Sequence, residues 1–177
     1  DTLSDRDFVW ARIDIPGDKD LWAISVHLKA ASDSATRRNN EAKQLLRLIA
    51  ANIPAADYLV IGGDFNTGSR TEACINTLSV ANQSPTPPEM PGVFITTSPW
   101  PADQAGDGDT NASRGSPYDW VIPDADLNAR ATPLVIGTRT FTNGLVYDSR
   151  VTVPYTFLPT PILSGDSDAA AMQHMAV

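Results

Sequence analysis

The stretch YLVIGGDFNTGS, residues 58–69, decides how the rest of this sequence is interpreted. It begins with four apolar residues rich in β-branched and aromatic side chains, and a short run of this kind bounded by turn formers predicts a buried strand. Gly62 and Gly63 allow the backbone to turn or to approach another group closely. Asp64 and Asn66 follow two apart, so in extended backbone their side chains point to one face. This carboxylate and carboxamide suit a hard cation or a phosphate, and an Asx turn is the structural alternative.

The composition is typical of one globular domain. The chain has 177 residues, of which 42% are hydrophobic and 19% charged, and that length is enough for a sizeable core. No apolar run approaches the ~20 residues of a membrane-spanning helix. The formal net charge of −8 weighs against a general nucleic-acid binder, although a nuclease can carry a local basic cleft. Cys74 is the single cysteine, which excludes an intrachain disulfide and a thiolate zinc cluster.

The residues before the central stretch predict a hairpin and then a helix. Residues 7–15 and 21–28 are expected strands, joined by the Pro-Gly turn 16–20. A helix is expected from a cap at 32–34 to about Asn52, with Pro54 as its stop signal. Its apolar positions repeat in steps of three and four: Ala42, Leu45, Leu46, Ile49, Ala50 and Ile53. The basic side chains are expected largely off this stripe: Arg37, Arg38, Lys43 and Arg47.

The second half of the sequence predicts fewer regular elements. A short helix is expected over 71–78, and a strand over 118–122 with Trp120 packed in the core. Between them, 81–116 reads as a long irregular connection containing a short strand at 92–96. Asn143-Gly144 predicts a hairpin turn between strands 132–142 and 145–153. The last strand is expected to have barely begun where the sequence stops.

Two histidines and one carboxylate are candidates for chemistry. His27 ends the second predicted strand and His174 lies near the last residues, and either alone is more typical of a structural histidine. Asp119 lies in an apolar strand, where a carboxylate is costly to bury unless it is paired. His174 is the candidate partner, because an Asp–His pair fixes the tautomer and orientation of an imidazole.

Taken in order, four blocks resemble the endonuclease/exonuclease/phosphatase superfamily, which includes pancreatic-type deoxyribonucleases, apurinic endonucleases, sphingomyelinases and inositol phosphatases. The blocks are SVHLK at 25–29, GDFN at 63–66, YDWV at 118–121, and the terminal His174 with apolar residues after it. Two further stretches are similar to bacterial members: RNNEAKQLL at 38–46 and NGLVYDSR at 143–150. Four blocks in the right order form a specific pattern, and the resemblance covers nearly the whole chain.

The resemblance implies an α/β fold, a sandwich of two packed, mostly antiparallel sheets flanked by helices, here lacking its amino-terminal strands. Residues 1–177 would form a single partial domain. The implied activity is metal-dependent phosphoester hydrolysis, of the phosphodiesterase, nuclease or phosphatase type. Asp64 would position or deprotonate the attacking water, and Asn66 would orient Asp64 and a phosphate oxygen. His27 and His174 would hydrogen-bond the phosphate, and Asp119 would hold His174.

The implied cofactor is Mg²⁺ or Mn²⁺, with Asp64, Asn66 and Asp168 as the expected ligands. Two departures weaken this site. The family's metal-binding Glu precedes the HLK block, whereas the glutamates here, Glu41, Glu72 and Glu89, all follow it. The family's Asp before the final His is Gln173 here, and the nearest acids are Asp166 and Asp168. Because magnesium prefers carboxylate oxygen, we expect weak metal affinity and at most trace activity from residues 1–177 alone, with the parent protein as the enzyme.

A non-catalytic fragment, or an interaction module that keeps the scaffold, is the alternative. Missing strands would leave a sheet edge and apolar surface uncovered, which predicts self-association or a partner segment. The acidic balance favours small phosphoesters or phospholipid headgroups over duplex DNA as substrates. The resemblance to bacterial members implies a secreted or periplasmic protein.

Overall fold

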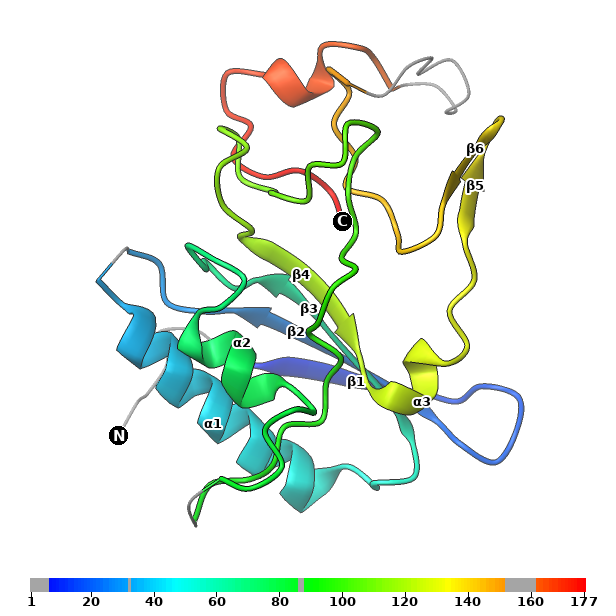
Figure 1. The fold of residues 1–177 in the computed structure, drawn as a ribbon. Coiled ribbons are helices and arrows are strands. Elements are labelled where there is room, and N and C mark those ends of the chain that lie inside the picture. The colour runs from blue at the N-terminus through cyan, green and yellow to red at the C-terminus, as the bar shows by residue number, and fades with distance from the viewer. Residues whose placement is uncertain (1–6, 32, 86–87, 152–161) are drawn as a thin grey trace. The chain divides into compact units, whose positions relative to one another are not determined.

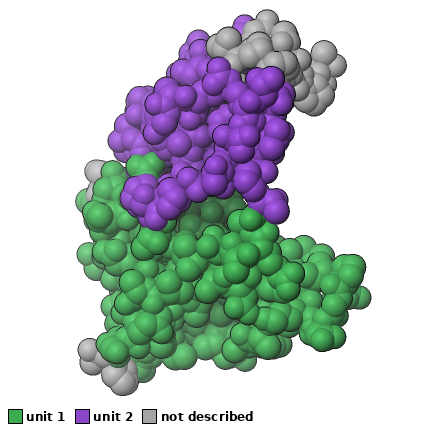
Figure 2. All heavy atoms as spheres, turned by 45° about the vertical axis from the view of Figure 1, so that its right-hand side comes forward, with its two compact units in different colours: residues 1–97, 120–131 green, residues 98–119, 132–177 purple. Residues whose placement is uncertain are grey.

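A computed structural model describes residues 7–31, 33–85, 88–151 and 162–177. The chain divides into two compact units, coloured separately in Figure 2. Unit 1 comprises residues 1–97 and 120–131, and unit 2 comprises residues 98–119 and 132–177. None of the helices in the described part of the chain is long and apolar enough to cross a membrane.

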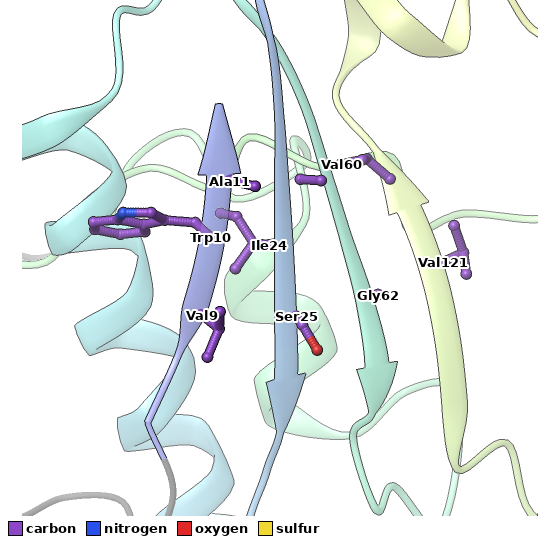
Figure 3. Close-up of a pocket in the computed structure, with 9 residues that line it drawn as sticks. Val9, Trp10, Ala11, Ile24, Ser25, Val60, Gly62 and Val121 are labelled. Atoms are coloured by element: carbon purple, nitrogen blue, oxygen red, sulfur yellow. The ribbon is translucent and has the colours of Figure 1, made fainter. Parts of the chain in front are cut away.

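A four-stranded sheet forms the centre of unit 1 (Figure 1). Its strands lie in the order β1-β2-β3-β4, with the bounds Val9–Ile13, Leu21–His27, Tyr58–Asp64 and Asp119–Pro123. β1 is antiparallel to β2, β2 is parallel to β3, and β4 runs opposite to β3 (Figure 3). The predicted α/β class is confirmed, and three of the predicted strands before residue 65 lie side by side in this sheet.

The parallel pair β2–β3 is the part of the sheet that positions functional residues. Its two strands are connected by helix α1, Ala35–Asn52, which provides the crossover that parallel neighbours require. In its register Leu21 lies opposite Tyr58 and His27 lies opposite Asp64. Both strands therefore end at the same edge of the sheet, and each ends on a polar side chain.

Helices α1 and α2, Ala73–Leu78, pack together and cover one face of the sheet (Figure 1). The predicted apolar stripe of α1 is buried at Ala42, Leu45, Leu46 and Ile49. Two expectations are wrong. Ala50 of the stripe is exposed. Arg38 does not lie off the stripe, since it is 2% exposed, and Glu41 is fully buried beside it. Arg38 lies four residues before Ala42, so the helical period continues through a charged residue.

The opposite face of the sheet carries apolar side chains that are exposed to solvent. A hollow of about 410 Å³ on this face is shown in Figure 3, with Ala11, Val60 and Val121 among its lining residues. Val9 and Val121 are 63% and 47% exposed. Apolar side chains are therefore exposed on this face of the sheet, whereas the missing strands expected to cover it stay a prediction.

Unit 2 contains a small antiparallel hairpin of β5, Leu134–Ile136, and β6, Arg139–Phe141. The hairpin predicted around Asn143-Gly144 is wrong. Ile136 pairs with Arg139, so the two-residue turn is Gly137-Thr138, with Gly137 at φ 59°. Asn143-Gly144 forms a separate turn, after which Tyr147 bridges to Ala176 instead of pairing back. Residues 152–153 of the predicted second strand lie outside the described residues.

The other predicted elements agree with the structure, except for the strand expected at 92–96. Helix α2 lies within the range expected for a short helix, and Trp120 is buried in the core. The described residues of 81–116 contain no helix or strand, and the strand expected at 92–96 is reduced to isolated bridges of Phe94. The short helix α3, Ala125–Asn128, follows β4, and a 3-10 turn spans Asp166–Asp168.

Gly63 has a backbone requirement that can be tested. Its φ is +137°, and a Cβ placed there would lie 2.0 Å from the backbone oxygen of Val26 in β2. We expect Gly63→Ala to lower the free energy of unfolding by about 2 kcal/mol or more, measured by urea denaturation. Gly68→Ala is the matched control, because a Cβ there meets no atom within 4 Å. Equal unfolding midpoints for the two variants would contradict the close approach of β2 and β3.

Candidate active site

In unit 1, the paired ends of β2 and β3 place His27 against Asp64. His27 Nε2 lies 3.2 Å from Asp64 Oδ2, a distance at which a protonated imidazole forms an ion pair with a carboxylate. The His27 side chain is 46% exposed and the Asp64 side chain 14%. The pair therefore combines a sheltered carboxylate with an imidazole that solvent or a ligand can reach.

Asn66 lies beside this pair and is fixed by two hydrogen bonds. We call the site formed by His27, Asp64 and Asn66 the unit 1 corner. Its backbone N–H donates to Asp64 Oδ1 at 2.7 Å, which is the Asx turn given as the structural alternative. Its side-chain amide donates to the backbone oxygen of Leu28 at 3.1 Å, and Leu28 N–H donates to Asp64 O at 2.9 Å. The backbone of Asn66 is left-handed, at φ 52°, where Asn is one of the better-tolerated residues.

The unit 1 corner offers hard oxygen donors. Asp64 provides a carboxylate, and Asn66 provides its side-chain carbonyl oxygen, because its amide nitrogen is the atom bonded to Leu28. Oxygen donors of this kind match magnesium or manganese in type. Asp64 is the one carboxylate among the predicted ligands that lies in unit 1.

In unit 2, Asp119 and His174 form the pair that the sequence predicted. His174 Nδ1 lies 2.8 Å from Asp119 Oδ2, although the two residues are 55 apart in the sequence. The ring of Tyr118 lies against the imidazole, with centroids 5.9 Å apart. The carboxylate therefore fixes both the orientation of the ring and the nitrogen that carries its proton.

The segment that carries His174 is held by backbone contacts on either side of the imidazole. Asn111 bridges to His174, and Ala112 N–H donates to the backbone oxygen of Gln173 at 2.9 Å. Thr110 joins the two halves of the pair, because its hydroxyl accepts from Asp119 N–H while its backbone oxygen accepts from Met175 N–H. The end of the irregular 81–116 connection, Thr110 to Ala112, therefore holds the segment that carries His174.

The NGLVYDSR block anchors the same terminal segment. Tyr147 N–H donates to Ala176 O at 2.8 Å. Asp148, 2% exposed, accepts two side-chain hydrogen bonds from Arg150. These bonds are the largest influence on the Asp148 carboxyl and, with the nearby charges of Arg150 and Arg114, hold its pKa below the ordinary value despite burial. The block therefore combines a backbone bond to the terminal segment with an ion pair on the buried carboxylate of Asp148.

The structure brings together His27, Asp64 and Asn66 in unit 1, and Asp119 and His174 in unit 2. The convergence of all five in one cleft stays a prediction. Asp168 lies in unit 2, where its 65% exposed side chain is 3.4 Å from Arg150 Nη1. Its predicted role as a metal ligand stays a prediction as well.

Sequence analysis missed a set of buried charges next to the unit 1 corner. Arg38, Glu41 and Glu72 bind the loops that follow β2 and β3. Two signals point to them: Arg38 and Glu41 lie at helical spacing from the apolar stripe, and Glu72 is one of only three glutamates.

No protein family profile matches the sequence, and no curated protein matches it. Solved structures with a similar arrangement include beta toxin from Staphylococcus aureus, at 18% identity and a TM-score of 0.45, covering 67% of this chain and 43% of that one. The human Nocturnin catalytic domain with bound sulfate has 16% identity and a TM-score of 0.45, covering 67% and 41%. SmcL has 22% identity and a TM-score of 0.42, covering 67% and 42%. This chain spans less than half the length of each of these structures.

The Asp119–His174 pair predicts the proton position on the imidazole. With Asp119 accepting from Nδ1–H, neutral His174 should show a protonated Nδ1 and an unprotonated Nε2 in its ¹⁵N chemical shifts at about pH 8. Asp119→Asn should mix or reverse this tautomer while changing the unfolding midpoint little. Asp126→Asn is the control of the same type, because this exposed carboxylate pairs with Lys19 in unit 1. An unchanged tautomer in Asp119→Asn would show that Asp119 does not orient the ring.

Proposed function

We propose that the protein containing this chain is a metal-dependent phosphoester hydrolase. The observation that carries the proposal is the contact of His27 with Asp64 at the paired ends of two parallel strands, with Asn66 fixed beside them. Ligands of α/β sheets bind at the carboxyl ends of parallel strands, so this corner is where a substrate is expected. The order of the sequence blocks supports the same class of reaction.

In the proposed reaction a water molecule attacks phosphorus, a new P–O bond forms, and the bond to the leaving oxygen breaks. Asp64 accepts a proton from the attacking water, as a carboxylate held within reach of the nucleophile can do. Asn66 presents its carbonyl side to the water and keeps Asp64 oriented through its backbone N–H. His27, in its protonated form, donates to a phosphoryl oxygen as negative charge builds there.

His174 has a complementary role in the proposal. Its Nδ1–H is directed to Asp119, so Nε2 is the ring nitrogen that would act on the phosphate or on the leaving oxygen. When the imidazole is protonated, Asp119 stabilises the extra charge, and the ring can protonate the leaving group as the old P–O bond breaks. The bond from Tyr147 N–H to the backbone oxygen of Ala176 and the bridge between Asn111 and His174 hold the segment that carries the ring.

A divalent cation completes the proposal. Asp64 and Asn66 are the unit 1 residues that would hold it, and Asp168 is the further ligand proposed from the sequence. Bound magnesium or manganese would neutralise phosphate charge and help to orient the water. Residues 1–177 alone offer few carboxylates, so we expect this chain by itself to bind the cation weakly and to show at most trace activity.

For the substrate, we propose a small phosphoester or a phospholipid headgroup. The net charge of −8 supports this choice, since a duplex-binding protein gains most of its affinity from a basic surface. An exported bacterial protein remains our proposal for its location.

We expect the full-length protein to hydrolyse bis(p-nitrophenyl) phosphate with Mg²⁺ and to lose this activity in EDTA. Asp64→Asn and His27→Gln should each lower kcat by about 100-fold or more, because they remove the base and a charge-stabilising donor. Asp126→Asn is the matched control, since this surface carboxylate pairs with Lys19 away from the corner. Undiminished hydrolysis by Asp64→Asn would refute the assignment. A full-length protein that hydrolyses no phosphoester would favour the interaction-module alternative.

A double-mutant cycle tests whether residues of the two units serve one reaction. Mutations of groups that act on the same transition state have strongly non-additive effects on kcat/KM. The kcat/KM of the double variant Asp64→Asn/His174→Gln should therefore lie within about tenfold of that of the worse single variant. The measurement is kcat/KM for the four proteins under identical cation concentrations. Multiplicative losses would indicate independent contributions and would count against a shared site.

A further inference from the structure

A closed circuit of hydrogen bonds surrounds the unit 1 corner. On one side, the loops after β2 and β3 are joined directly, through the bonds of Leu28 with Asp64 and Asn66. On the other side they are joined through Arg38 of α1, which is buried, and Glu72 before α2, which is partly buried. The loop after β2 and the loop after β3 are therefore connected to each other in two separate places.

Arg38 binds the loop after β2. Its Nη1 donates to the backbone oxygens of Lys29 and Ala31, at 3.0 and 2.8 Å. Ala31 has a φ of 89°, a conformation that costs energy for a residue with a side chain and so requires support. Glu41, one turn further along α1, accepts from Lys29 N–H at 2.9 Å. The loop that follows His27 is thus bound at three backbone atoms by α1.

Glu72 binds the loop after β3 and pairs with Arg38. Its Oε2 accepts from Gly68 N–H at 3.1 Å, two residues after Asn66, and its Oε1 accepts from Arg38 Nε at 2.6 Å. The largest influence on Glu72 is burial, which opposes ionisation. The hydrogen bonds from Arg38 and Gly68 and the charge of Arg38 outweigh it and hold the pKa of Glu72 below its ordinary value. Glu72 is therefore a carboxylate at neutral pH and keeps the circuit closed.

A buried thiol lies against the same carboxylate. Cys74 is fully buried, with its Sγ 3.7 Å from Glu72 Oε1. Burial, and then the charge of Glu72, raises the pKa of Cys74 to about 12. The thiol therefore stays protonated and acts as a weak donor, not as a nucleophile.

We propose that Arg38 and Glu72 are positioning residues, which hold the loop of Asp64 and Asn66 against the end of β2. Neither side chain touches the reacting atoms in this assignment. They act through Gly68, Lys29 and Ala31, and so set the separation of Asp64 from His27. The inference rests on the proposed function only for the statement that this separation matters to phosphoester hydrolysis.

The test is Glu72→Gln in the full-length protein, with Glu89→Gln as the matched control. Glu89 loses the same charge but pairs with Lys43 at a half-exposed site away from the corner. Amide hydrogen exchange measured by NMR should be at least about tenfold faster at Asn66 and Gly68 in Glu72→Gln, with Ile24 in central β2 unchanged. On bis(p-nitrophenyl) phosphate, kcat should fall roughly 10- to 100-fold while KM stays within about twofold.

The outcomes separate this inference from the proposed function. Unchanged exchange at Asn66 and Gly68, or equally faster exchange throughout unit 1, overturns the positioning role. Local loosening in a protein whose wild type hydrolyses no phosphoester supports the positioning role and refutes the proposed function. If Glu72→Gln does not fold, Glu72→Asp decides: it keeps the charge and shortens the side chain, and the same local loosening is expected.

Discussion

The close parallel approach of β2 and β3 is the constraint on which the rest of unit 1 depends. It requires a residue without a Cβ at Gly63, because the backbone oxygen of Val26 occupies that space. It also requires the long helix α1 between the strands, since parallel neighbours cannot be joined by a short turn. The same helix then supplies the buried charges that bind the loops at the strand ends. The pairing of β2 and β3, the crossover helix and the loops at the strand ends thus depend on one another. His27 and Asp64 lie opposite each other where the two strands end.

Local sequence patterns predicted unit 1 well because its elements are strongly periodic. The apolar run of β3, the stripe of α1 and the stop at Pro54 each indicate one structure and agree with one another. The buried Arg38 was missed because a charged residue is ordinarily placed on the solvent side of a helix, and only its partners make burial favourable. Those partners come from loops distant in the sequence, which periodicity cannot reveal. The His27–Asp64 contact is of the same kind: it follows from strand register and not from composition.

In unit 2 a long-range contact was easier to predict than the local structure. Its long-range pair, Asp119 with His174, was predictable because a carboxylate in an apolar strand demands a partner and the sequence offers few histidines. Its local structure was harder to predict. Asn143-Gly144 is a strong turn signal, and the residues do form a turn, but a turn signal does not determine which strand the chain pairs with next. Gly137, with its positive φ, provides the hairpin instead.

The environment of Cys74 has a consequence for the redox chemistry of the chain. Thiol oxidation and disulfide exchange proceed through the thiolate, and burial raises the pKa of Cys74 to about 12, so the thiol stays protonated at neutral pH. Full burial also denies access to oxidants and to a second chain. Since this is the single cysteine of residues 1–177, the folded chain should resist both dimerisation through a disulfide and oxidation of its thiol. The state of this thiol should therefore be the same in oxidising and in reducing surroundings.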